Sequence, residues 1–109
     1  MKMMFVWFRR VDLTHEQSLS AWGGAKHVSI VRTVPGLKKW VHNRVTNPGE
    51  NAPDGIGELW FDSAQAMEQA WSSARGAAAM EDGKRFADME RSYGLVVEER
   101  TVIGQEASV

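Results

Sequence analysis

The sequence predicts an α+β fold with the element order β-α-β-β-α-β, and three observations support it. An apolar run at residues 3–8 has the composition of a strand. Two stretches with apolar residues at helical spacing, 14–34 and 63–91, flank a pair of strand-like segments. A last β-rich segment at residues 93–102 completes the order.

The first strand and first helix have clear local signals. Met3 to Phe8 is apolar at every position, which is typical of a strand buried on both faces. Thr14 followed by Gln17 fits a capping box, so a helix is expected to begin there and to end at Pro35-Gly36. Its inward stripe would be Leu19, Trp22, Ala25, Val28 and Val31.

The middle of the chain predicts two strands joined by a loop. Residues 37–46 alternate, with Trp40, His42 and Arg44 on one face. Residues 47–55 concentrate turn-forming residues, and residues 56–62 form the third strand.

The second helix is expected to start at a cap formed by Asp62 or Ser63 and to be interrupted near Gly76. Helical character resumes over residues 77–91 before the last strand. The predicted inward residues of the resumed segment are Met80, Phe86, Ala87 and Met89.

This order predicts a ferredoxin-like split unit, in which a four-stranded antiparallel sheet carries both helices on one face. The first strand is apolar on both sides, so the bare face of the sheet needs a cover. A second copy of the chain supplies it most simply, which predicts a homodimer. We expect one domain over residues 1–109, with 104–109 as a frayed tail.

Composition excludes several functional classes. The formal charge of -1 and the absence of a basic run disfavour nucleic acid as a partner. The lack of cysteine removes disulfides and thiol nucleophiles, and no histidine pair at i, i+4 suggests a metal site. No membrane segment is evident, so a soluble cytoplasmic protein is expected.

The chain resembles the EthD-like family of dimeric α+β barrel proteins from Met4 to about Thr101. The residues that carry the resemblance are Trp22 and His27 on the first helix, "VPGLKKWVHNR", "GIGELWFDSAQAM", and "EDGKRF" with Asp82 and Phe86.

The resemblance implies a cofactor-free protein that acts on cyclic or aromatic metabolites as a dehydratase, cyclase, isomerase or accessory factor in catabolic or polyketide pathways. It matches the family's helix histidine to His27, and its aromatic residue after the Pro-Gly turn, often tyrosine, to Trp40. This chain has Leu59 where the family's lactone methylisomerases use cysteine, which disfavours that reaction. Trp22 and His27 are one residue further apart than expected, and a bulge at Gly23-Gly24 would absorb the difference.

His27 is the main candidate for acid–base chemistry, since imidazole takes and gives protons near neutral pH. We expect Gly23 to leave a gap beside the imidazole for a ligand atom. The alternative is an ordinary, partly exposed helix histidine. Asp82 either holds the tautomer of His27 across the cavity or caps a helix.

The remaining candidates are aromatic or charged. Five tryptophans and six methionines suit a flat ring substrate, although core packing would also use them. The predicted substrate-binding residues are Trp40, His42, Trp22, Trp60 and Phe86. For His42, a solvated or dimer-facing strand edge is the alternative, and His15 is expected in solvent. Glu58 is expected to form a salt bridge with a neighbouring strand.

Three functional hypotheses follow. The first is a cofactor-independent lyase, cyclase or isomerase with His27 as general acid and base in an apolar pocket between the first helix and the sheet. The second is a protein of the same fold that binds a metabolite without chemistry. The third is a cofactorless monooxygenase or a haem-handling protein.

Overall fold

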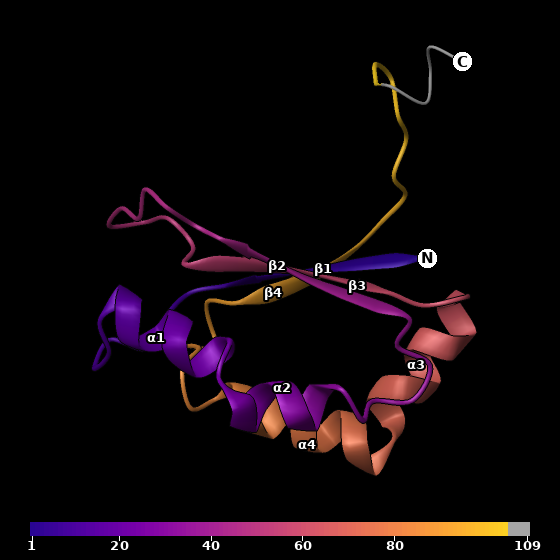
Figure 1. Ribbon diagram of the computed structural model, residues 1–109, viewed down its shortest axis with the longest axis horizontal. Coiled ribbons are helices and arrows are strands. Elements are labelled where there is room, and N and C mark those ends of the chain that lie inside the picture. The colour runs from indigo at the N-terminus through magenta and orange to yellow at the C-terminus, as the bar shows by residue number, and fades with distance from the viewer. Residues whose placement is uncertain (105–109) are drawn as a thin grey trace.

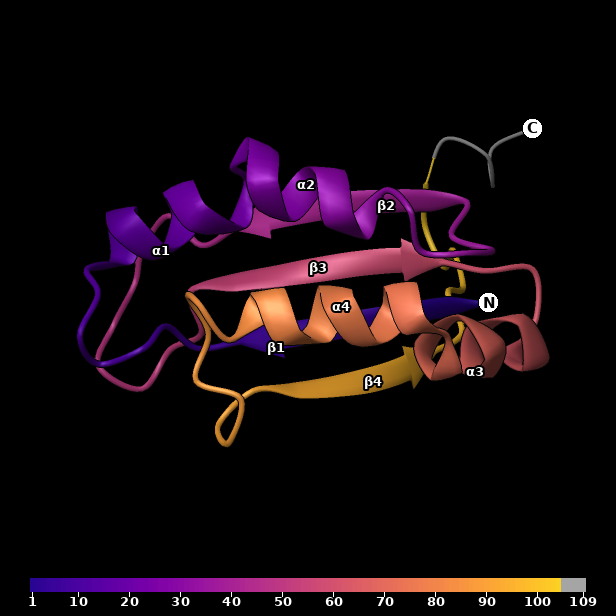
Figure 2. The same ribbon diagram turned by 90° about the horizontal axis from the view of Figure 1, so that it is seen from below.

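The computed structural model describes residues 1–104, in which a four-stranded antiparallel sheet carries four helices on one face (Figures 1 and 2). The strands are β1 (Lys2–Trp7), β2 (Lys39–Arg44), β3 (Gly55–Trp60) and β4 (Tyr93–Val97). The helices are α1 (His15–Trp22), α2 (Ala25–Val31), α3 (Ala64–Ser72) and α4 (Ala74–Gly83). The strand order β2-β3-β1-β4 is that of the ferredoxin-like split unit, so the predicted fold is confirmed. The predicted tail beyond residue 104 lies outside the described residues.

The first predicted helix is two helices rather than one. The capping box of Thr14 and Gln17 is present, as predicted. Gly23 caps the end of α1 and Gly24 precedes α2 in an extended conformation. A Cβ on Gly24 would lie 2.8 Å from the carbonyl oxygen of Ser20, so the tight connection requires glycine.

This break changes which residues of α2 face the sheet. The predicted continuous stripe placed Ala25 inward, but Ala25 is exposed and His27 is buried instead. Gly23 is also exposed and leaves no gap beside the imidazole, so that prediction is wrong. The helix restarts after Gly24, and the period counted from α1 no longer applies.

The second predicted helix also consists of two, but they are not divided at Gly76. Ser73 separates α3 from α4, and its hydroxyl accepts a hydrogen bond from the backbone N–H of Gly76, which lies inside α4. The helix ends at Gly83. Residues 84–91 were predicted to be helical, but they are not. Phe86 is buried as predicted, whereas Met80 is 44% exposed.

The side chains on the two faces of the sheet have different surroundings. The helix-facing residues Trp7 and Leu59 belong to the buried core. On the opposite face, Glu58 pairs with Lys2 at 2.9 Å, which confirms the predicted salt bridge. Tyr93 and Leu95 lie on that face and are 50% and 48% exposed. Within residues 1–104, no helix has the length and apolar character to cross a membrane.

Candidate functional site

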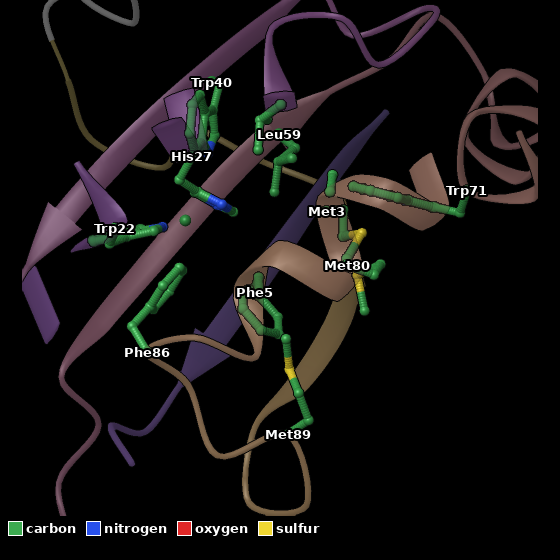
Figure 3. A pocket seen from close by; sticks show the side chains of 14 residues that line it. Met3, Phe5, Trp22, His27, Trp40, Leu59, Trp71, Met80, Phe86 and Met89 are labelled. Carbon is green, nitrogen blue, oxygen red and sulfur yellow. The ribbon is translucent and has the colours of Figure 1, made fainter. Parts of the chain in front are cut away.

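The candidate site is an apolar cavity between the helices and the sheet, with a volume of about 50 Å³ (Figure 3). Five of its residues come from the strands: Met3, Phe5, Trp40, Gly57 and Leu59. The others come from the helices and the segment after α4: Trp22, His27, Val31, Trp71, Ala79, Met80, Gly83, Phe86 and Met89. His27 is the one ionisable side chain in this lining.

A buried hydrogen bond joins His27 on α2 to Asp82 on α4. The distance from Nδ1 to Asp82 Oδ2 is 2.8 Å, and the two residues are 6% and 7% exposed. Because the carboxylate only accepts hydrogen bonds, Nδ1 carries the proton and Nε2 of the neutral ring is left as an acceptor. Within residues 1–104, the only hydrogen bond of the imidazole is the one to Asp82.

Arg85 fixes the carboxylate from the other side. Its Nε and Nη2 donate to the two oxygens of Asp82 at 2.7 and 2.9 Å. This fork matches the planar geometry of a carboxylate. Asp82 is therefore oriented before any ligand binds. Sequence reasoning did not include Arg85 in the site, although its i, i+3 spacing from Asp82 is a recognisable signal of an ion pair.

The electrostatics favour a neutral imidazole beside an ionised carboxylate. Burial lowers the pKa of His27, and the hydrogen bond and charge of Asp82 offset only part of that effect. The hydrogen bonds from Arg85, followed by that from His27, lower the pKa of Asp82 to about 2. At neutral pH the pair is thus a base whose free nitrogen is Nε2.

Aromatic rings surround His27. The Phe86 and Trp40 rings present edge-to-face contacts to the imidazole, with centroids at 4.9 and 5.9 Å. Trp22 also lines the cavity and is 2% exposed. These three residues lie where sequence reasoning placed the substrate. Together they give this end of the cavity an aromatic, apolar lining.

Two other predicted substrate-binding residues lie away from the cavity. His42 is not among the lining residues; it stacks on Trp22, with ring centroids 3.6 Å apart and an interplanar angle of 10°, and meets the Trp40 ring edge-to-face at 4.3 Å. Trp60 lies on the opposite face of the sheet, where the ammonium groups of Lys2 and Lys39 lie over its ring. Alternation along β3 separates it from the cavity-lining Leu59.

Comparison with known proteins identifies the family. A family model described as the EthD domain matches residues 10–90, which include all four helices, β2 and β3. The chain belongs to the EthD family. A search of curated proteins finds no match to it.

Several solved structures share the fold of this chain. An EthD family protein from Bacillus halodurans is 22% identical, with a TM-score of 0.73 over 91% of this chain and 97% of that one. A dimeric ferredoxin-like protein from Bacteroides fragilis is 14% identical, with a TM-score of 0.64 over 86% and 90%. SnoaB, a cofactor-independent oxygenase from Streptomyces nogalater, is 12% identical, with a TM-score of 0.61 over 93% and 96%. At these identities the likeness concerns the fold alone.

Proposed function

We propose that this EthD protein is a cofactor-independent enzyme that moves a proton on a cyclic or aromatic metabolite, as a lyase, dehydratase, cyclase or isomerase. The observation that carries the proposal is the buried His27–Asp82 pair. His27 lines an apolar cavity, and its Nε2 makes no hydrogen bond within residues 1–104. Aromatic or polyketide metabolism is the proposed setting.

The chemistry follows from the protonation states. Nε2 of neutral His27 takes a proton from the substrate, and the resulting imidazolium is stabilised by the ionised Asp82. The same Nε2–H can return the proton to another atom of the substrate or to a leaving hydroxyl. Dehydration, cyclisation and isomerisation all consist of such a transfer and return.

The cavity must widen to admit a ring. Drug-sized ligand pockets measure roughly 300–1,000 Å³, against about 50 Å³ here. Met3, Met80 and Met89 line the cavity, and unbranched methionine side chains adjust their rotamers readily. Their movement would open space for a single flat ring. A haem is a much larger ligand, and the cavity does not support the haem-handling hypothesis.

We also propose a homodimer formed through the open sheet face. This face presents Met4, Val41, Ile56, Tyr93 and Leu95. The Bacteroides protein with a similar fold is described as dimeric, which supports a dimer here. Analytical ultracentrifugation should give twice the chain mass of 12.2 kDa; a species at the chain mass would contradict it. Cytoplasmic location stays a prediction.

A mass-spectrometric turnover screen tests the enzymatic proposal. Wild-type protein and His27→Ala would be incubated in parallel with aromatic, polyketide and lactone compounds. A change of mass or retention time with wild type alone is the expected result. Binding without any conversion would instead support the second hypothesis, sequestration of a metabolite. Full conversion by His27→Ala would exclude the histidine mechanism.

Cofactorless oxygenation is the second candidate activity. The similar fold of SnoaB supports it, and deprotonation of the substrate by His27 would be its first step as well. Running the screen under oxygen gas labelled with oxygen-18 distinguishes oxygenation from proton transfer alone. Incorporation of the label into the product identifies an oxygenase, whereas lyases and isomerases leave the label out.

A further inference from the structure

A small space in the cavity wall is framed by two tryptophans. Gly57 on β3 lines the cavity and has no side chain there. A Cβ at this position would lie 3.7 Å from the indole nitrogen of Trp40 and 3.5 Å from Cζ2 of Trp22. These are ordinary contact distances, so an atom of a ligand fits at the place that a side chain would fill. Figure 3 shows Trp22, His27 and Trp40 grouped at one end of the cavity.

The two indole N–H groups are available to a ligand. An indole nitrogen is only a donor, and no acceptor for Trp22 or Trp40 is found within the described residues 1–104. The indole N–H groups of Trp7 and Trp71 also have no hydrogen-bond acceptor within residues 1–104, but these nitrogens are fully buried. Trp22 and Trp40 differ from them, because both line the cavity and their indole nitrogens are not among the fully buried ones.

The hydrogen-bonding pattern of this place selects a chemical group. Nε2 of neutral His27 is an acceptor, and the two indoles are donors. A hydroxyl group has one proton to donate and lone pairs that accept two hydrogen bonds. We infer that Trp22, Trp40 and His27 around Gly57 form a subsite for a phenol or enol hydroxyl on a flat ring.

This inference rests on the proposed function for its chemistry and names the substrate class. The hydroxyl proton passes to Nε2 of His27, and the electron pair of the O–H bond stays on oxygen. The oxyanion that forms accepts hydrogen bonds from the indoles of Trp22 and Trp40 in a site shielded from water. No oxidant or further reactant is needed for this step.

Side-chain NMR with phenol and toluene as probes tests the subsite. The two molecules have the same shape, and only phenol has a hydroxyl group. The five tryptophans give five indole N–H signals, assigned with single Trp→Phe variants. The Trp22 and Trp40 protons should move downfield with phenol relative to toluene. The Trp7 and Trp71 signals should differ little between the two probes.

Affinity ratios provide the second measurement. Trp22→Phe and Trp40→Phe retain an aromatic ring without the N–H, and each should lower the preference for phenol over toluene about fivefold. Trp60→Phe is the matched control, because Trp60 lies on the opposite face of the sheet from the cavity, and its preference should equal that of wild type. Gly57→Ala should fold and lose phenol binding, because its methyl group occupies the subsite.

Three results would overturn the inference. These are equal shifts for phenol and toluene at Trp22 and Trp40, a phenol preference unchanged in both Trp→Phe variants, and no shift with phenol up to its solubility limit. All of these measure binding without turnover. A phenol preference without any conversion in the screen would therefore refute the proposed enzyme and retain the subsite.

Discussion

Two histidine–aspartate pairs lie at different places in the fold, and they differ in what the second ring nitrogen contacts. His15 Nδ1 lies 2.6 Å from Asp54 and His27 Nδ1 lies 2.8 Å from Asp82. Nε2 of His15 lies 2.9 Å from the carbonyl oxygen of Val45, whereas Nε2 of His27 makes no hydrogen bond within residues 1–104. Proximity to a carboxylate alone does not distinguish a structural histidine from a reactive one.

The His15 pair connects three segments of the chain. Asp54 is 5% exposed and also accepts a hydrogen bond from the backbone N–H of Arg9 at 2.8 Å. Through His15 this carboxylate joins the start of α1 to the loop before β3. Both ring nitrogens of His15 face acceptors, so no atom is left for a substrate. We conclude that this pair holds the loop in place.

Exchanging each histidine for alanine should give the largest effect and the clearest contrast. His27→Ala should lower turnover by about 10²–10⁴-fold, the usual contribution of a general acid or base. His15→Ala should retain turnover and lower the free energy of unfolding by about 1–3 kcal/mol, because Asp54 loses a partner. Turnover assays and urea unfolding measure the two effects. Equal losses of turnover in both variants would remove the distinction between the pairs.

Removing the charge of each carboxylate should give the next largest effect. Asp82→Asn should lower turnover about 10- to 100-fold, because the tautomer of His27 is no longer fixed. Asp54→Asn should leave turnover near wild type. If Asp82→Asn retained full turnover, the orienting role would be wrong.

The same carboxylate predicts a change of stability with pH. The pKa of Asp82 is lowered to about 2 from its ordinary value of 3.8. Its stabilising contribution is therefore present above pH 3.8 and is lost as the pH falls toward 2. Thermal melts between pH 4 and 2 should show a smaller decline in Asp82→Asn than in wild type. Equal declines would show that Asp82 does not govern this range.

The sequence predicted the order of the elements because hydrophobic spacing and capping are local signals. It also indicated His27 and Asp82, which meet across 55 positions of the chain. It placed His15 in solvent, because its partner Asp54 lies 39 positions away in a loop without periodicity. Such long-range pairs have no local pattern, so helix capping remained an equal alternative for Asp82.

The side chains that point toward the core were harder to predict than the order of the helices and strands. The break at Gly24 restarts the helical phase, so counting from α1 correctly placed Val31 inward but wrongly placed Ala25 there as well. Strand alternation correctly grouped Trp40 with His42 on the helix-facing side, but it could not show that Trp22 covers His42. Side-chain packing decides which residues of one face reach a cavity.

His42 differs from both His15 and His27, because its ring makes no hydrogen bond within residues 1–104 and its Nε2 is buried. Burial, then the charges of His27 and Arg44, lower its pKa from 6.5 to about 4. The unfolded chain therefore binds a proton between pH 6.5 and 4 that the folded chain excludes, and stability falls as the pH decreases through this range.

His42→Phe should remove that part of the pH dependence while retaining an aromatic ring against Trp22. We expect wild type to lose about 1–2 kcal/mol more than the variant between pH 6.5 and 4, after allowance for partial solvent screening. Urea unfolding at several pH values measures the difference. Parallel curves for the two proteins would contradict the low pKa of His42.

Lys26→Ala should have the smallest effect and tests whether any charge near Asp82 influences the pair. Lys26 Nζ lies 3.9 Å from Asp82 Oδ1, and its side chain is 68% exposed. Exposed ion pairs contribute about 0–1 kcal/mol, and Arg85 already donates to both carboxylate oxygens. Turnover and its pH profile should stay within about twofold of wild type. A larger change would mean that Arg85 alone does not orient Asp82, and that the solvent-exposed charge takes part in fixing the tautomer of His27.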